Sequence, residues 1–312
     1  MSKVYFIDNP NLVDQLFDAA EIKKLIEPKD FVALKIHFGE RGNTAFLKPE
    51  RTKPIVKKVK ESGGRPFWTD ANTLYEGSRG DTLAHLQDAF DHGYTFGKTG
   101  AQVLIADGLH GKNTEKIQVN YKNLKELSVA ALVFEAQVLL AVTHFKGHEL
   151  TGFGGTLKNI GMGLGSKAGK LDMHSDCDHC KARLACQKKK TLQACWVGSS
   201  ELVQEKIVEY TAGILERFKN KAAFINFITD VSPNCDCYDH NDPPIVPDLG
   251  ILASFDPVAV DQASVDLVNK SEGRIAGPDK FRTIFPDVNW EIQLNYAEEL
   301  GLGSRRHELI KL

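Results

Sequence analysis

The sequence lacks three features that would assign it to a class at once: an excess of charge of one sign, a long apolar run and a low-complexity tract. Its 39 Lys and Arg residues nearly balance its 41 Asp and Glu residues, so no overall field recruits nucleic acid or an anionic membrane. The most apolar stretch, residues 129–142, contains Glu135 and Gln137 and is too short to cross a bilayer. These absences predict a soluble globular protein that binds neither nucleic acid nor membranes.

A secretory signal is also lacking, because no apolar core of signal-peptide length follows Met1 before Asp8 and Asn9. We therefore expect a cytoplasmic protein. In that reducing compartment, cysteines serve metal or redox chemistry more often than structural disulfides.

Cysteine is scarce, with six residues in 312, but most of it falls in one polar stretch. The cysteines of this stretch are Cys177, Cys180, Cys186 and Cys195. Thiolates gather at such spacing because a soft metal needs several sulfur ligands at one point. The stretch therefore indicates an iron–sulfur cluster, of the 4Fe-4S kind among others, or a zinc ion. The remnant of a lost site, disulfides and free thiols are the alternatives.

Apolar runs rich in Val, Ile and Phe alternate with helix-length amphipathic segments, which is typical of βα repeats. This alternation predicts an α/β fold with a mainly parallel sheet flanked by helices. The expected strands are residues 3–7, 31–38, 65–69, 103–106, 138–145, 223–228 and 249–253. The expected helices are residues 11–26, 51–61, 81–91, 200–218, 256–269 and 290–300. We expect a single domain, residues 1–312, with a short cysteine-rich insertion at residues 172–198.

Ionisable side chains collect where the expected strands finish. These side chains are His37, Asp70, His144, Lys146 and Asp230. Ligands of open parallel sheets bind beyond the carboxyl ends of the strands, so we expect a cleft there with His37, Asp70, His144 and Lys146 as catalytic groups. One such residue alone is usually a cap or turn residue, but separate turns have no structural need to share this chemistry.

A Gly-rich stretch, residues 151–170, follows the strand that ends near His144. Its glycines would let backbone N–H groups approach an anion at a helix N-terminus, and Lys158 would add charge. The stretch is not a P-loop, because no Gly-x-x-x-x-Gly-Lys-Ser/Thr occurs. A closely packed connection that requires positive φ is the alternative.

A second set of donors lies at residues 234–242. If this segment is extended, Cys235 and Cys237 project to the same side and can share a metal while Asp236 faces away. The alternatives are a redox pair and a turn, stabilised by Asn and Asp, in which the cysteines only fill space.

Several motifs agree in order and spacing with one family. They are Lys35-Ile-His-Phe-Gly-Glu-Arg-Gly-Asn-Thr44, Thr69-Asp-Ala-Asn-Thr-Leu-Tyr75, Thr143-His-Phe-Lys-Gly-His148, Gly154-Gly-Thr-Leu-Lys-Asn-Ile-Gly161, and Pro233-Asn-Cys-Asp-Cys237 through Asp261-Gln-Ala-Ser264. Over nearly the whole chain the sequence resembles the iron–sulfur-centre proteins of domain-of-unknown-function family 362. Within these motifs, the candidate substrate-binding residues are Asn43, Thr44, Asn72, Thr73, His148, Lys158 and Asn159.

The resemblance fails in the cysteine-rich insertion. Members of the family carry an insert for two ferredoxin clusters, whereas this insertion has four cysteines and lacks the Cys-Pro ending, so two standard clusters are not expected.

Together these observations predict an iron–sulfur or metal-binding redox protein with a strand-end cleft for a small anionic substrate or a metal, served by a redox partner protein. A non-redox metalloenzyme with a structural zinc clip and a metal-handling module without turnover are the alternatives.

Overall fold

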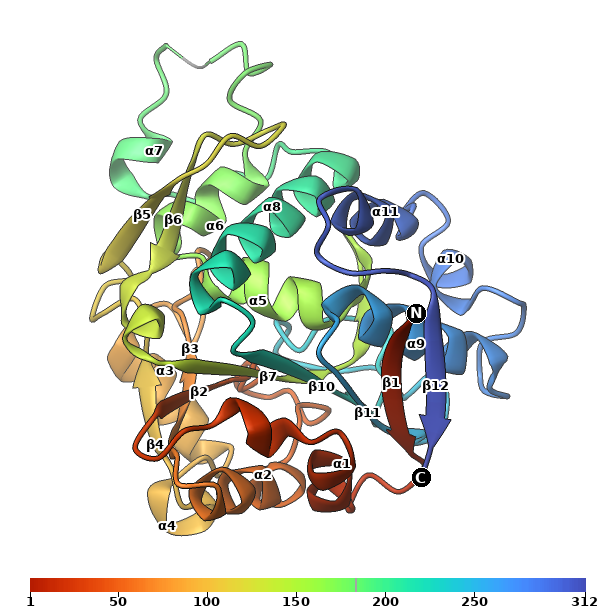
Figure 1. Ribbon diagram of the computed structural model, residues 1–312. Helices are drawn as coiled ribbons and strands as arrows, with labels where there is room; N and C mark the ends of the chain where they lie inside the picture. The colour runs from red at the N-terminus through yellow and green to blue at the C-terminus, as the bar shows by residue number, and fades with distance from the viewer. Residues whose placement is uncertain (183) are drawn as a thin grey trace.

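An eight-stranded sheet, in the order β12-β1-β11-β10-β7-β2-β3-β4, runs through the middle of the molecule (Figure 1). The computed structural model describes residues 1–182 and 184–312. The strands of the sheet are β1 (Ser2–Ile7), β2 (Phe31–Lys35), β3 (Arg65–Asp70), β4 (Gln102–Ile105), β7 (Val138–His144), β10 (Ala222–Ile228), β11 (Gly250–Ser254) and β12 (His307–Lys311). Strand β11 is antiparallel to both neighbours and the other pairs are parallel. This confirms the expected α/β class.

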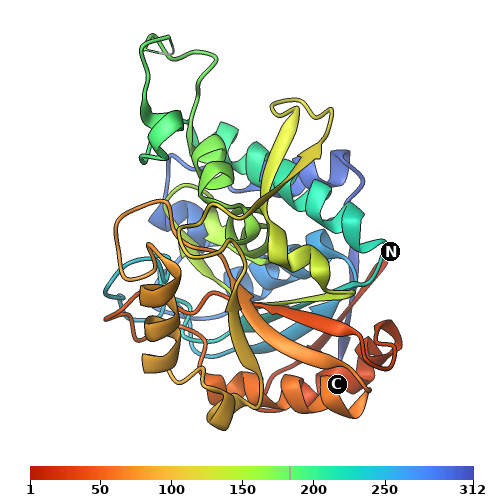
Figure 2. The same cartoon turned by 90° about the vertical axis from the view of Figure 1, so that its left-hand side faces the viewer.

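Helices cover both faces of the sheet (Figures 1 and 2). One face carries α1 (Val13–Ala19), α2 (Pro49–Glu61) and α4 (Phe96–Thr99), and the other carries α5 (Thr156–Leu164), α8 (Ser200–Phe218), α9 (Pro257–Lys270) and α11 (Glu291–Glu299). The remaining described helical segments are η1 (Ile22–Leu25), α3 (Thr82–Asp91), η2 (Ala131–Glu135), α6 (Lys167–His174), α7 (Lys188–Thr191) and α10 (Lys280–Ile284). Because both faces are covered, a central strand such as β7 is apolar along most of its length rather than alternating.

Alternate residues of each strand enter two separate cores. In β7, for example, Leu140 and Val142 pack with the α1 and α2 side, whereas Leu139 and Ala141 pack with the α5 and α8 side. This division follows from the two-residue period of a strand.

Two small hairpins lie outside the main sheet: β5 (Thr114–Gln118) with β6 (Glu126–Ala130), and β8 (Lys146–His148) with β9 (Gly152–Gly154). The second hairpin packs against the chain that follows β10, where the Gly147 N–H donates to the Ser232 carbonyl at 2.8 Å. A Cβ on Gly147 would lie 1.9 Å from the Pro233 carbonyl oxygen, so only glycine permits this approach. The hairpin therefore brings residues 146–148 next to the Cys235–Cys237 segment.

One predicted helix, residues 11–26, is wrong in extent. Helix α1 stops at Ala19, and the 3-10 turn η1 follows only after Glu21, which has a left-handed φ of 57°. The two pieces are therefore not one continuous helix.

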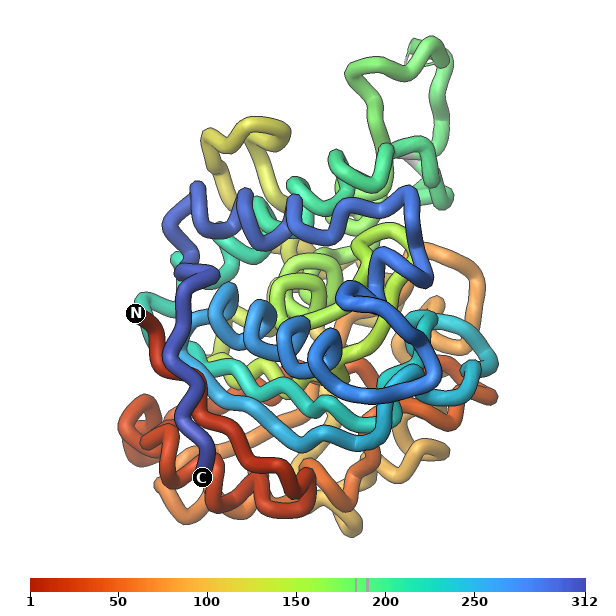
Figure 3. The backbone as a smooth tube through the Cα atoms, turned by 90° about the vertical axis from the view of Figure 1, so that its right-hand side faces the viewer, coloured from red at the N-terminus to blue at the C-terminus, as the bar shows by residue number. Residues whose placement is uncertain are grey.

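The cysteine-rich insertion projects from the body between α6 and α8 (Figures 1 and 3). The chain leaves at His174 and returns at Gly198, whose N–H donates to the His174 carbonyl at 2.9 Å. Residue 183 of this insertion lies outside the described residues. Within the described ranges, no helix combines the length and apolar character needed to cross a membrane.

Candidate metal and anion site

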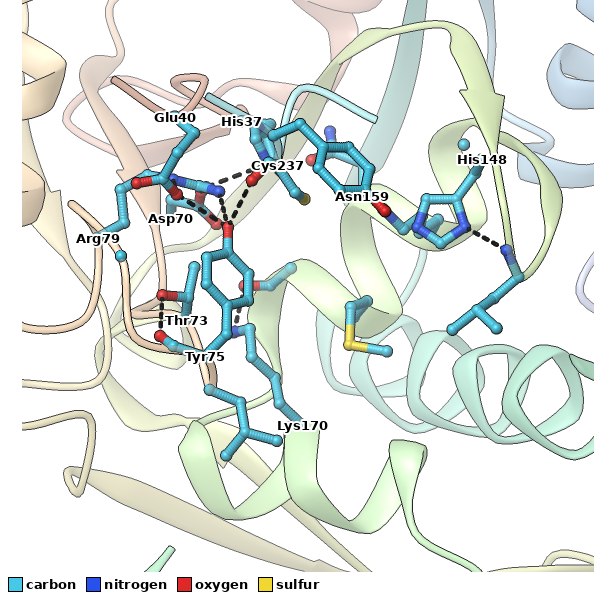
Figure 4. A pocket seen from close by; sticks show the side chains of 18 of the residues that line it. His37, Glu40, Asp70, Thr73, Tyr75, Arg79, His148, Asn159, Lys170 and Cys237 are labelled. Atoms are coloured by element: carbon cyan, nitrogen blue, oxygen red, sulfur yellow. Dashed lines mark hydrogen bonds and ion pairs between the residues drawn. The ribbon is translucent and has the colours of Figure 1, made fainter. Parts of the chain in front are cut away.

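A pocket of about 790 Å³ opens beyond the carboxyl ends of β2 and β3 (Figure 4). Its walls come from the ends of these strands, the loop before α3, the β8–β9 hairpin, helices α5, α6 and α8, and the segment after β10. The sequence-predicted residues that line it are His37, Asp70, Thr73, Lys146, His148, Lys158, Asn159 and Cys237. The pocket lies where a parallel sheet is expected to bind its ligands.

Three candidate metal ligands meet at this pocket: His37, Cys235 and Cys237. The His37 Nε2 atom lies 3.3 Å from the Cys237 Sγ atom, and the two Sγ atoms are 2.8 Å apart. All three ligand atoms lie within 4.8 Å of one another, and no other group of three or more His, Cys, Asp or Glu residues in the described part of the chain does so. The two cysteines therefore project to one side, but the segment is a turn, in which the Tyr238 N–H donates to the Cys235 carbonyl at 3.2 Å, and not the extended chain on which that prediction is based.

The pKa values of the two thiols are shifted in opposite directions. A hydrogen bond from Cys237 and the nearby Lys158 ammonium hold the pKa of Cys235 well below its usual value, whereas donation to Cys235 and burial raise the pKa of Cys237. Lys158 Nζ donates to the Cys235 Sγ at 3.2 Å. Cys235 therefore loses its proton more readily than Cys237 does.

The ring of His37 is neutral. Burial, Arg79 and Lys146 hold the pKa of His37 well below 6.5. The Gly39 N–H donates to Nδ1 at 3.0 Å, and Nε2 lies 3.1 Å from Arg79 Nη1 and 3.3 Å from Cys237 Sγ. Because a guanidinium can only donate, both ring nitrogens face donors. A metal ion at Nε2 would therefore compete with the Arg79 guanidinium for the lone pair of that atom.

Asp236 faces away from the two sulfur atoms and anchors the segment that carries them. Its Oδ2 atom lies 2.7 Å from His144 Nδ1 and 3.3 Å from Lys146 Nζ. Burial raises the pKa of Asp236, but His144 and Lys146 outweigh that effect and the net pKa is lowered. The other ring nitrogen of His144 lies 2.7 Å from the Thr229 carbonyl oxygen. Both nitrogens of His144 are therefore engaged with acceptors, which suits a positioning residue better than a catalytic one.

A second buried ion pair lies beneath the pocket. Lys35 Nζ contacts Asp70 Oδ1 at 3.0 Å, Asn159 Oδ1 at 2.8 Å and the Ile36 carbonyl at 3.1 Å, so all three of its donors have acceptors. Burial lowers the pKa of Lys35, and Asp70 partly opposes this. Lys35 thus holds Asn159 and Asp70 in place.

Arg79 joins the two sides of the pocket, and Figure 4 shows it beside Glu40, Tyr75 and Asp70. Its guanidinium donates to Glu40 at 3.2 Å and to the Tyr75 hydroxyl at 2.5 Å. The Tyr75 hydroxyl in turn lies 2.9 Å from Glu40 and 3.3 Å from the Cys237 carbonyl. The loop before α3 is thereby fastened to the cysteine segment.

Two lysines in the pocket retain unused donors. Among the described residues, Lys146 has Asp236 as its one hydrogen-bond or ion-pair partner, and Lys158 has Cys235. Both are buried, and an ammonium has three donors, so each can still bind an anion in the pocket.

The Gly-rich stretch does not supply the backbone anion site considered from the sequence. The N–H groups of Thr156 and Leu157, at the start of α5, donate to the buried carboxylate of Asp261 at 2.7 and 3.0 Å. A Cβ on Gly155 would lie 2.4 Å from that carboxylate. The helix N-terminus is therefore already capped from within the protein.

Other predicted residues lie away from the pocket lining. Asn43 is buried and donates to the carbonyls of Tyr238 and His240, Thr44 is exposed and bonds to Asn241, and Asn72 donates to Asp107. Asn43 and Thr44 therefore tie the loop after β2 to the segment after Cys237. Their role in substrate binding, and that of Asn72, stays a prediction.

The cysteines of the insertion are all free and partly exposed, and they do not form a group of three ligands. Cys177, Cys180, Cys186 and Cys195 thus do not present a ready-made site for an iron–sulfur cluster or a zinc ion in this arrangement. Their role as metal ligands stays a prediction.

Sequence reasoning missed several buried charges of the site. They are Lys35, Glu40, Arg79, Lys170 and the anchoring role of Asp236. A lysine within the apolar strand 31–38 was a usable signal, because a buried ammonium requires a partner. Nothing local marks Glu40 or Arg79, whose partners are fixed by the fold.

A family model described as Domain of unknown function (DUF362) matches residues 32–266. Among solved structures, the chain is similar to the lactate racemase apoprotein from Thermoanaerobacterium thermosaccharolyticum, with 17% identity and a TM-score of 0.42, over 74% of this chain and 51% of that one. It is also similar to a structural-genomics protein from Thermotoga maritima, with 11% identity and a TM-score of 0.45, over 94% of this chain and 60% of that one. The chain thus spans between half and two thirds of these structures. No curated protein matches it significantly.

Proposed function

This chain belongs to the family described as Domain of unknown function (DUF362), and on that premise we propose that it is a metal-dependent protein in which His37, Cys235 and Cys237 hold a divalent ion beside a pocket for a small organic anion. The observation that carries the proposal is the convergence of these three ligand atoms beside the pocket, which His37 and Cys237 line. Two residues separated by one position and a third from a distant strand have no structural need to meet there.

The donor set fits a metal of borderline softness. Thiolate sulfur and imidazole nitrogen are the ligands that zinc and similar ions prefer, and three protein ligands leave a coordination position free. A metal bound there would polarise an anion or a water molecule in the pocket. Lys158 Nζ, 3.2 Å from the Cys235 Sγ, would help to hold Cys235 as a thiolate, and metal binding would release the proton of any cysteine ligand that carries one.

The charges around this position favour an anionic ligand. Lys146 and Lys158 supply free donors, and neither is exposed by more than 9%. In a pocket with little water, such donors bind a carboxylate or phosphate more strongly than surface lysines do.

Lys170 is the group best suited to exchange a proton in this pocket. Burial lowers its pKa to about 8, although Asp107 and Asp70 oppose the effect. An amine with a pKa near the working pH can act as a general base or acid. Metal-assisted acid–base chemistry on a small anion is therefore the reaction class that the site supports best.

Metal analysis of three proteins tests the proposal: the wild type, a Cys237→Ser variant and a Cys195→Ser variant, all purified without oxygen and then dialysed against zinc. We expect about one zinc per chain in the wild type and in Cys195→Ser, and at least a tenfold loss of affinity in Cys237→Ser. Cys195 is the matched control, because it is a cysteine of the insertion.

Measurement of acid-labile sulfide and of the visible spectrum distinguishes an iron–sulfur cluster in the insertion from the proposed inner metal site. Iron with sulfide that disappears in a Cys177→Ser/Cys180→Ser variant, while Cys237→Ser keeps it, would refute the proposed inner site and establish a cluster in the insertion. Equal zinc affinity in all three proteins would refute it as well.

A further inference from the structure

One wall of the pocket is apolar and contains neither the candidate metal ligands nor the lysines. Met162 on α5, Val203 and Ile207 on α8, and Leu150 after β8 line its side beyond the charged groups. Val203 and Ile207 are four residues apart and share one face of α8. Val203 and Ile207 are only 1% exposed and back this wall, whereas Met162 and Leu150 are partly exposed. A ligand small enough to contact only the charged end would leave Met162 and Leu150 facing water.

Helix α5 contributes to both the charged end and the apolar wall of the pocket. Lys158 and Met162 are also four residues apart, on the pocket face of α5, so their positions differ by about 6 Å along the helix axis. An extended alkyl chain covers that distance with roughly five carbon atoms, judged from covalent bond lengths near 1.5 Å. The ammonium group of Lys158 and the thioether of Met162 can therefore contact two ends of one ligand.

The cysteine-rich insertion adds a large side chain to the apolar wall of the pocket. Trp196 lines the pocket with 52% of its surface exposed, and its ring meets that of His174 edge to face at 4.3 Å between centroids. Burial lowers the pKa of His174 to about 3, so this ring is neutral and adds no charge to the wall. A large, partly exposed indole over a pocket of about 790 Å³ can cover the body of a bound ligand.

From this arrangement we propose that the ligand is an amphipathic carboxylate, with its carboxylate at Lys146 and Lys158 and an apolar body of about six to eight carbons against Leu150, Met162 and Trp196, the exposed apolar side chains of the wall. This inference rests on the proposed function, whose small organic anion it specifies. The proposed ligand is a medium-length acyl or aryl acid and not a short organic acid, which would occupy only the charged end of the pocket.

Calorimetric titration with octanoate, butyrate and octylamine tests the inference, using protein with and without zinc. We expect octanoate to bind at least tenfold more tightly than butyrate, because each methylene buried on the wall adds affinity. Octylamine should bind at least tenfold more weakly than octanoate, because its cationic head meets two lysines.

Two variants assign the two ends of the ligand. Lys158→Met keeps the stem and removes the charge, and it should weaken octanoate and butyrate by similar factors of at least five. Met162→Gln should weaken octanoate several-fold and leave butyrate unchanged. Lys57→Met, at a lysine 75% exposed on α2, is the control and should alter neither affinity.

The outcomes separate this inference from the metal site. Octanoate binding no tighter than butyrate, in protein that binds zinc, would overturn the inference and leave the proposed function intact. Selective octanoate binding in protein that binds no zinc would support the apolar wall and count against the metal. Equal binding of octanoate and octylamine would overturn the inference, since no anionic head would then be recognised.

Discussion

Asp70 is the carboxylate on which the charge balance beneath the pocket depends. Lys35 and Arg79 are each only 1% exposed, and both lie near it. In Asp70→Asn, Lys35 would remain buried without its counter-ion, so we expect the free energy of unfolding to fall by about 3–5 kcal/mol. Urea denaturation followed by circular dichroism measures this loss. Glu61→Gln, which breaks the exposed Lys57–Glu61 pair, is the control and should change stability by less than about 0.5 kcal/mol.

Because of this carboxylate, the free energy of unfolding should depend on pH in the acid range. Burial raises the pKa of Asp70, but Lys35, His85 and Arg79 outweigh it, so the net pKa lies below 3.8. A depressed carboxyl pKa contributes stability above the unfolded pKa, and that contribution is lost as the pH falls through the folded value. The stability gap between wild type and Asp70→Asn should be constant above about pH 5 and shrink below it. A gap that persists unchanged at pH 2 would contradict the role given to Asp70.

Asp236 should act on the metal without touching it. It holds the segment between the two cysteines through His144 and Lys146, so Asp236→Asn should weaken zinc binding by about 10- to 100-fold. Competition with a chelating dye measures the affinity. Asp239→Asn is a matched control, because Asp239 is 80% exposed on the same segment and pairs with His240. Equal losses in the two variants would show that any carboxylate of the segment has this effect.

At the scale of elements, the approach of α5 to α8 depends on one glycine. A Cβ on Gly161 would lie 2.2 Å from the Ile207 carbonyl oxygen, so Gly161→Ala forces the helices apart. We expect a loss of about 1–3 kcal/mol in the free energy of unfolding, together with weaker ligand binding because Met162 and Ile207 move. Gly97→Ala in α4 has nothing within 4 Å of the new Cβ and should be neutral or stabilise by up to about 1 kcal/mol. Thermal unfolding of both variants makes the comparison.

The elements that could be predicted from the sequence are those whose burial is complete. The strands at 31–35, 138–144 and 222–228 lie in the middle of the sheet. Their runs are largely apolar, with Asn226 the one polar interior residue and polar residues otherwise only at the carboxyl ends, which leaves little ambiguity. The hairpin β5–β6 was missed because Thr114–Gln118 carries polar side chains on a half-exposed ribbon. The short β8–β9 hairpin was missed because its residues are held by the segment after β10 and not by a local pattern.

Part of the candidate site could also be predicted from the sequence. His37, Asp70 and Lys146 follow strands that a parallel sheet must align, so their meeting follows from the fold class. The pairing of His144 with Asp236 joins residues 92 positions apart, and no local spacing indicates it. The same holds for Lys35 and Asn159, which are 124 positions apart.

At the scale of the whole molecule, the insertion is attached at one narrow point, where Gly198 returns to His174. Among the described residues from His174 to Gly198, no side chain belongs to the two main cores. Replacing residues 177–195 with a short Gly-Ser linker should therefore lower the melting temperature by only a few degrees and preserve zinc binding at His37, Cys235 and Cys237. Calorimetry and metal analysis of the excised protein provide the check. Loss of folding would mean that the insertion is an integral part of the fold.

The position of β1 also bears on how the chain is made. Strand β1 pairs with β11 and β12, whose residues follow it by more than 240 positions, whereas β2, β3 and β4 are adjacent in the sheet and complete by Ile105. During translation at about 5–20 residues per second, β1 waits roughly 12–50 s for its first partner. Its apolar side chains Val4 and Phe6 remain uncovered for that time. We therefore expect β1 of a nascent chain to stay unpaired, and open to aggregation, until the last third of the chain has left the ribosome.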